Sequence, residues 1–137
     1  MGGERFTYTA TPLADGPAAT RPFLPLTLVH GSNSAATTGL LDTGADVNVL
    51  PYHLGIALGA VWLAQRTIAR LSGNLSDHEA RGLLLTARVA EFGPARLVFA
   101  WTRATDVPLI LGQVNVFAEF DVCFFGAQRA FELQPRR

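Results

Sequence analysis

The sequence predicts an all-β domain with one or two short helices. Apolar residues alternate with polar ones in several short runs, which is the pattern of half-buried strands. Turn-forming residues separate those runs, with 13 Gly and 8 Pro among 137 residues. The hydrophobic fraction of 49% supplies enough apolar side chains for one core. Short strands separated by turns in a chain of this length are typical of a single β-sandwich or β-barrel.

In the first half of the chain, the alternation predicts strands over residues 6–9, 23–29, 35–41 and 47–49. Leu24, Leu26 and Leu28 recur at period two, so the second of these strands is expected to bury one face. Residues 10–21 contain two prolines and a glycine and are expected to form a loop. Residues 52–58, between a proline and a glycine, predict a short helix.

In the second half, strands are predicted over residues 61–70, 83–89 and 95–101, with a final hairpin of 121–125 and 131–134. Residues 113–120 are expected to form a second short helix. Trp62 and Trp101 are expected to be core residues or interface anchors, and Cys123 is expected to be a small buried side chain. The whole chain is therefore predicted to hold about eight or nine short strands and two helices.

The composition excludes several functions. All eleven basic residues are Arg, and they balance eleven acidic residues. The absence of Lys excludes a Walker phosphate-binding loop and a Schiff-base lysine, and the absence of a basic cluster argues against a nucleic-acid partner. A single Cys cannot form a disulfide within the chain. Because neither a signal peptide nor a membrane-spanning stretch is recognised, we expect a cytoplasmic protein without a membrane partner.

The most informative motif is Leu40-Leu41-Asp42-Thr43-Gly44-Ala45. It places an acidic side chain directly after two leucines, where a predicted strand ends in a turn. Asp-Thr-Gly also occurs in ordinary turns, because Asp and Gly both favour them. The motif therefore becomes specific only together with a second one far downstream, Leu109-Ile110-Leu111-Gly112.

The two motifs, in this order, resemble those of the retropepsin-like (retroviral-type) aspartic proteases, and residues 47–51 resemble bacterial single-domain members of that group. The resemblance implies a retropepsin-like acid protease fold, a closed and strand-rich subunit with one lobe per chain. The protease domain would span residues 22–137, after an N-terminal strand and loop over 1–21, within a single domain overall.

The resemblance also implies roles for individual residues. Asp42, Thr43 and Gly44 would form the catalytic motif, and Leu111 and Gly112 would form a structural motif that threads past the catalytic loop. Substrate-binding roles are implied for Ala45, Asp46 and Ile110 and, at the tip of a flap hairpin, for Leu71, Ser72, Gly73 and Asn74. No cofactor is expected, and no metal site, since the three His residues lack the spacing of zinc ligands.

The chain carries only half of the catalytic group that this chemistry needs. Aspartic proteolysis uses two carboxyl groups that share one proton, whereas the sequence contains a single Asp-Thr-Gly. The second carboxyl must come from another molecule, and a symmetric homodimer is the economical source. We therefore expect an aspartic endopeptidase whose partners are a second copy of itself and a peptide or protein substrate.

Two residues depart from well-known patterns of aspartic proteases. Gln113 stands where retroviral members carry an Arg that pairs with an acid after the catalytic motif, here Asp46, so this support is uncharged. Ala45 stands where two-lobed pepsin-like enzymes carry Ser or Thr. Because Ala45 cannot donate a hydrogen bond to the carboxylate, we expect activity at mildly rather than strongly acidic pH.

Two other functions stay open at this point. A non-catalytic retropepsin-like domain could serve in dimerisation or peptide binding, and the departure at Gln113 favours it mildly. A β-sandwich binding module of another family would require the two motifs to be coincidental.

Overall fold

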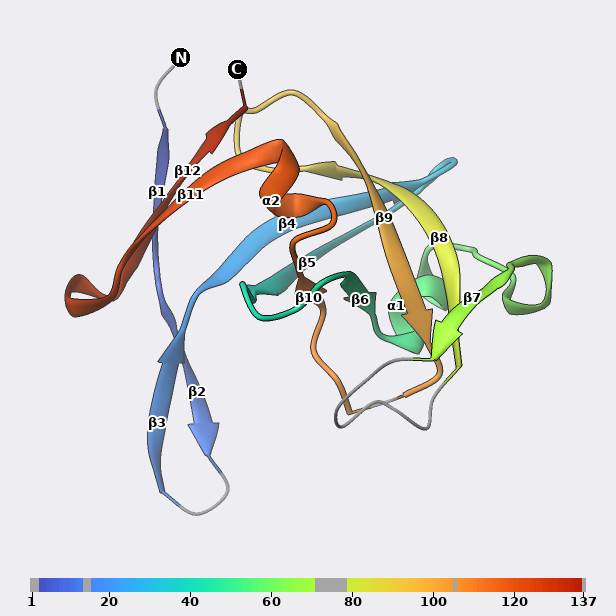
Figure 1. The fold of residues 1–137 in the computed structure, drawn as a ribbon, viewed down its shortest axis with the longest axis horizontal. Coiled ribbons are helices and arrows are strands. Elements are labelled where there is room, and N and C mark those ends of the chain that lie inside the picture. Colours follow the sequence, from blue (N-terminus) through green and yellow to red (C-terminus); the bar gives the residue numbers. More distant parts are fainter. Residues whose placement is uncertain (1–2, 14–15, 71–78, 105, 137) are drawn as a thin grey trace.

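The structure is a computed structural model that describes residues 3–13, 16–70, 79–104 and 106–136, except for the side chains of 11–13, 16–18 and 67–70. Six strands form a closed barrel (Figure 1), in the order β4-β5-β10-β6-β9-β8 with β8 paired back to β4. They are β4 (Phe23–His30), β5 (Asn33–Leu41), β6 (Asn48–Leu50), β8 (Glu79–Arg88), β9 (Ala95–Thr102) and β10 (Ile110–Leu111). A further strand, β7 (Thr67–Arg70), pairs with the start of β8.

The core of the barrel follows the predicted alternation. Leu24, Leu26 and Leu28 are buried along β4, so the period of two is confirmed there. The tryptophans lie in the core as predicted, with their rings 5.0 Å apart. On β8 and β9 the predicted inward residues are likewise buried: Leu83, Leu85, Ala87, Ala95, Leu97, Phe99 and Trp101.

Three strands from the two ends of the chain form a second sheet beside the barrel. Its order is β1-β12-β11, with β1 (Glu4–Thr7), β12 (Ala130–Pro135) and β11 (Phe120–Phe125). The pairing of β11 with β12 confirms the predicted final hairpin. Phe131 of β12 is fully buried in the main core and stacks on Phe6 of β1, so one face of this sheet packs against the barrel. The predicted domain boundary after residue 21 stays a prediction.

The predicted loop over residues 10–21 is wrong. Strands β2 (Thr9–Leu13) and β3 (Gly16–Arg21) pair antiparallel and project from the barrel as a hairpin (Figure 1). Pro12 and Pro17 suggested a loop because proline cannot donate to a ladder. In a two-stranded sheet both strands are edge strands, and an edge strand tolerates proline.

The prediction for Cys123 is also wrong, because its side chain is exposed. Successive side chains of a strand point to opposite faces of the sheet. Val122 is half-buried and packs against the core, so Cys123 lies on the opposite face, away from the barrel. The alternation was visible in the sequence, but it did not reveal that only one face of this sheet is covered.

Both predicted helices form, in shortened versions. They are α1 (Tyr52–Ala57) and α2 (Val116–Glu119). The predicted strand over 61–70 divides into a 3₁₀ helix, η1 (Trp62–Ala64), followed by β7, and a second 3₁₀ helix, η3 (Gly126–Gln128), joins β11 to β12. The described residues contain twelve strands rather than eight or nine. Within them, the helices are all too short to cross a membrane.

Candidate active site

Asp42 lies directly after the last residue of β5. Leu41 is buried in the core, Asp42 is half-buried, and the Thr43 and Gly44 that follow are exposed. The backbone N–H of Gly44 donates to Asp42 Oδ1 at 2.9 Å. A Cβ atom on Gly44 would lie 3.3 Å from that oxygen, so glycine leaves room for the carboxylate above the turn. The local sequence thus presents an oriented acid at the end of a buried strand.

The second sequence motif lies beside the first. Strand β10 runs parallel to the end of β5, with Ile110 opposite Leu40 and Leu111 opposite Leu41. The N–H of Asp42 donates to the carbonyl of Leu111 at 3.0 Å. The two motifs, far apart in sequence, are therefore joined through the backbone of the acidic residue itself.

Beyond β10 the chain crosses the loop that begins at Asp42. The N–H groups of Gln113 and Val114 donate to the carbonyls of Ala45 (2.9 Å) and Asp46 (2.8 Å). Gly112 is required here by close approach, because a Cβ atom would lie 2.6 Å from the carbonyl oxygen of Val47 and 2.7 Å from that of Ala45. We call this arrangement, residues 42–48 with 112–115, the crossing.

Carboxamide side chains hold the crossing together. Gln113 Nε2 donates to the carbonyl of Thr43 at 2.9 Å, so the residue in the Arg position supports the loop without a charge. Asn48 is fully buried; its Oδ1 accepts from the N–H of Gly112 at 2.8 Å, and its Nδ2 donates to the carbonyl of Val98 at 3.0 Å. Three ion pairs between described side chains lie outside the crossing: Arg5–Glu132, Arg81–Glu79 and Arg136–Glu119.

Asn115 ties the other side of the crossing to the barrel. Its Oδ1 accepts from the N–H of Val98 at 3.1 Å, and its Nδ2 donates to the carbonyl of Arg96 at 2.9 Å. One carboxamide thus makes the two hydrogen bonds that a neighbouring strand would offer to β9. Sequence reasoning missed both Asn48 and Asn115. The available signal was Asn48 itself, a polar residue between two valines in a predicted strand, where a buried carboxamide must find partners.

The remaining predicted site residues divide into three groups. Ala45 is half-buried and Asp46 is exposed, both within the crossing. Ile110 is half-buried against a small cluster of Val49, Ala80 and Ala100, whereas Leu111 is buried in the main core. The predicted flap residues lie outside the described residues: Leu71, Ser72, Gly73 and Asn74. In the described part of the chain, potential metal-ligating side chains form no group of three.

The comparisons with known proteins bear on the fold. No known family model matches the sequence, and no curated protein matches it. Among solved structures, the chain is similar to the crystal structure of a retropepsin-like aspartic protease from Rickettsia conorii. The TM-score is 0.55 at 12% sequence identity, over 97% of this chain and 94% of that chain. At this identity the similarity is one of architecture, and it agrees with the closed barrel and the crossing: the chain has a retropepsin-like fold.

Proposed function

We propose that the protein is an aspartic endopeptidase that acts as a homodimer, with Asp42 of each copy supplying one carboxyl group. One observation carries the proposal. An oriented, half-buried carboxylate lies at the end of β5, its Oδ1 held by the N–H of Gly44 at 2.9 Å, at the point where two distant sequence motifs cross. The likeness in fold to a retropepsin-like aspartic protease supports this assignment.

The chemistry follows from two carboxyl groups held close together. At a separation of about 3 Å both cannot ionise easily, so the pair shares one proton. The ionised carboxylate accepts a proton from water, which attacks the scissile carbonyl, and the protonated partner donates a hydrogen bond to that carbonyl oxygen. Thr43 is exposed beside Asp42, and we propose that it contacts the corresponding loop of the second copy.

The expected substrate is an extended peptide. Peptide strands bind proteases by adding to sheet-like backbone groups, while pockets at alternate side chains set the preference. Ala45, Asp46 and Ile110 are the described residues that we propose for contact with that strand. The apolar side chains of Ala45 and Ile110 predict a preference for an apolar side chain beside the cleaved bond.

The direct test is Asp42→Asn, which keeps the shape of the side chain but removes the ionisable group. We expect cleavage of a mixed peptide library, read by mass spectrometry, to fall by at least about a thousandfold, with an unchanged thermal midpoint. Glu91→Gln is the matched control, since it removes one exposed carboxylate in the turn between β8 and β9. Unchanged cleavage by the Asp42→Asn variant would overturn the proposal.

A mixing experiment tests the sharing of the site between two copies. Adding a threefold excess of the Asp42→Asn variant to wild-type chains should leave about a quarter of the wild-type chains with a wild-type partner. Specific activity should fall to that fraction after the subunits have exchanged. Activity that is insensitive to the excess would show that one chain contains the whole site.

A further inference from the structure

Three aromatic rings form a platform at the end of β9. Tyr52 of α1 stacks on Trp101 of β9, with the ring centroids 5.6 Å apart. Trp62 of η1 lies edge-on to both rings, 5.8 Å from Tyr52 and 5.0 Å from Trp101. The indole Nε1 of Trp101 donates to the carbonyl of Tyr52 at 3.2 Å, and a Cβ atom on Gly55 would meet the Trp101 ring at 2.1 Å. Helix α1 therefore holds the rings in one arrangement.

Two arginines lie against the Trp62 ring. The guanidinium carbon of Arg81 is 4.6 Å from the ring centroid, and that of Arg103 is 5.0 Å from it. The guanidinium of Arg103 also lies 6.0 Å from the ring centroid of Tyr52. A cation–π contact holds a planar guanidinium group in place and leaves its N–H edge available to a further partner.

The two arginines differ in what else they bind. Arg81 is half-buried, and its Nε donates to the carboxylate of Glu79 at 3.1 Å while its Nη1 donates to the carbonyl of Trp62 at 2.6 Å. Arg103 is exposed, and it forms no ion pair with any side chain that the structure describes. In that part of the chain, the guanidinium of Arg103 is thus oriented by the platform but has no carboxylate partner.

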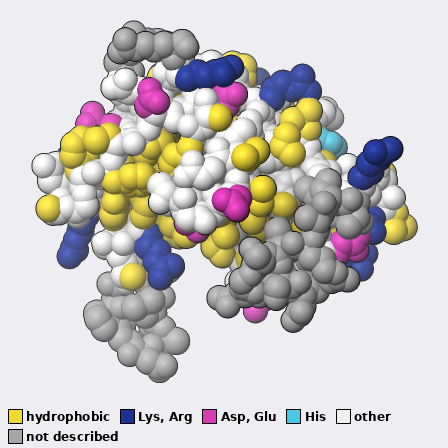
Figure 2. Space-filling model, in the orientation of Figure 1, with side chains coloured by type: hydrophobic (Ala, Val, Ile, Leu, Met, Phe, Trp, Pro, Cys, Tyr) yellow, Lys and Arg dark blue, Asp and Glu magenta, His cyan; other side chains and the backbone are white. Residues whose placement is uncertain are grey.

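Exposed apolar side chains flank Trp62 in the sequence. Val61 is 61% exposed, and Leu63, at 83%, is the most exposed of the large apolar side chains among the described residues. Figure 1 draws α1, β7 and the end of β9 at one end of the barrel, away from β11 and β12. Figure 2 shows Arg side chains and hydrophobic ones at the right edge of the molecule, where Figure 1 places β7. We call Val61, Trp62, Leu63, Arg81 and Arg103 the arginine corner.

We propose that the arginine corner is a docking site for an acidic segment of a partner protein, in which a carboxylate binds Arg103 and an apolar side chain packs on Leu63. A guanidinium edge can bind a carboxylate through two parallel N–H···O bonds. Because stacking on Trp62 already restricts the Arg103 side chain, less conformational entropy is lost on binding. The inference goes beyond the proposed function, since the site contains no residue of the crossing.

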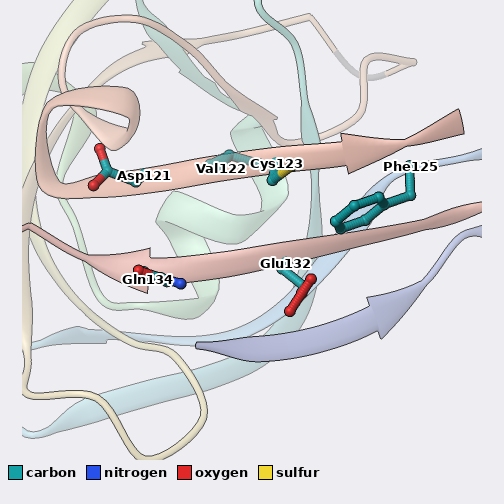
Figure 3. A pocket seen from close by; sticks show the side chains of 6 residues that line it. All are labelled: Asp121, Val122, Cys123, Phe125, Glu132 and Gln134. Carbon is teal, nitrogen blue, oxygen red and sulfur yellow. The ribbon is translucent and has the colours of Figure 1, made fainter. Parts of the chain in front are cut away.

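Charge complementarity favours this corner over another surface of the described residues. β11 and β12 line a shallow hollow of about 320 Å³ (Figure 3), and the lining side chains include the carboxylates of Asp121 and Glu132. These carboxylates would repel an acidic segment. The two surfaces therefore differ in the charge of the partner that they fit, and an acidic partner fits the arginine corner.

A protein partner also fits the corner better than a lipid surface does. Segments that bind anionic lipids typically gather about four to eight flexible basic side chains. The arginine corner instead holds two arginines against one ring, and one of them is already paired with Glu79. A single oriented guanidinium group suits a single carboxylate.

Intrinsic fluorescence gives a local readout of docking, because both tryptophans of the chain belong to the platform. The probe is a pool of capped octapeptides with Glu and Leu fixed two positions apart, so that both side chains lie on one face of an extended chain. Aromatic residues are left out of the varied positions. We expect a saturable change with wild type, and at least about tenfold weaker binding of a pool with Gln in place of Glu.

Substitutions in the corner test the two contacts separately. Arg103→Met keeps the apolar stem over the rings and should weaken binding of the Glu pool by at least about tenfold. Arg103→Lys keeps the charge but loses the planar fork, so binding should still weaken by at least about threefold. Leu63→Ser removes the apolar contact and should weaken binding by about fivefold. Arg88→Met, which changes an exposed arginine at the far end of β8, is the matched control and should bind like wild type.

Three outcomes would overturn the docking site. They are equal affinity of the wild-type chain for the Glu and Gln pools, equal affinity of Arg103→Met and wild type for the Glu pool, and a wild-type chain that binds anionic phospholipid vesicles through Arg103 but gives no response to the Glu pool. The last result would assign the corner to a lipid surface. The Asp42→Asn variant should bind the Glu pool like wild type, so docking and cleavage can fail independently.

Discussion

The crossing at Asp42 and the strand β11 differ in how fully their backbone N–H and C=O groups are paired. In the crossing, N–H groups and carbonyls of two distant segments are paired within the chain, and the buried Asn48 bridges Gly112 to β9. Within the described residues, β11 pairs only with β12, so one side of its backbone has no strand partner there. The acid thus lies where backbone groups are paired within the chain, whereas β11 keeps one side of its backbone without a strand partner in the described residues.

The difference shows how one chain can hold Asp42 in a fixed position and still supply only one of the two carboxyl groups that the proposed function needs. Holding Asp42 in place requires only contacts within one chain, because the N–H of Gly44 donates to Asp42 Oδ1 and the N–H of Asp42 donates to the carbonyl of Leu111. Under the proposed function, a second chain would supply the other carboxyl group of the pair. The two tasks can therefore be perturbed separately.

The largest effect is expected from Gly112→Ala. A Cβ atom at this position would meet two backbone carbonyl oxygens at 2.6 and 2.7 Å, and backbone atoms cannot move aside as a side chain can. We expect the free energy of unfolding to fall by about 3 kcal/mol, as measured by urea denaturation. Gly93→Ala is the control, because a Cβ atom there has open space. Equal stability of the two variants would show that the crossing is looser than the structure indicates.

A smaller and more local effect is expected from Gln113→Glu. The amide nitrogen that donates to the carbonyl of Thr43 becomes a carboxylate oxygen, which repels that carbonyl. The side chain is exposed, so we expect a change of at most about 1 kcal/mol in stability, together with a clear loss of kcat. Gln65→Glu makes the same change at the half-buried Gln65, whose Nε2 donates to the carbonyl of Val61. Equal kcat values for the two variants would show that Gln113 does not support the candidate site.

The sequence was sufficient for the parts of the fold that depend on alternation and local motifs. The buried faces of β4 and β8 and the two helices follow from the spacing of apolar residues and from turn residues. The retropepsin-like architecture followed from two motifs whose pairing the structure shows directly, since Leu41 lies opposite Leu111.

What the sequence did not reveal depends on tertiary partners. The hairpin β2–β3 and the exposure of Cys123 are decided by whether a neighbouring layer covers a strand, and a pattern within one strand does not contain that information. The roles of Asn48 and Asn115 depend on atoms some 20 to 60 residues away in sequence, so a carboxamide in an apolar run signals only that a partner exists. The flap residues 71–74 stay a prediction, as do the catalytic roles themselves.

The smallest expected effect, a shift in pH dependence, comes from Ala45→Ser in the crossing. Ala45 donates its N–H to the carbonyl of Asp42 at 3.1 Å, but its side chain offers no donor. A serine hydroxyl beside the carboxyl pair would stabilise the ionised form, so the acidic limb of the pH–rate profile should move down by about one pH unit. The limb should stay in place in the Cys123→Ser variant, because that hydroxyl lies on β11. If both variants shifted the limb equally, the separation between the crossing and β11 would fail, since a change on β11 would then reach the candidate site as strongly as one beside Asp42.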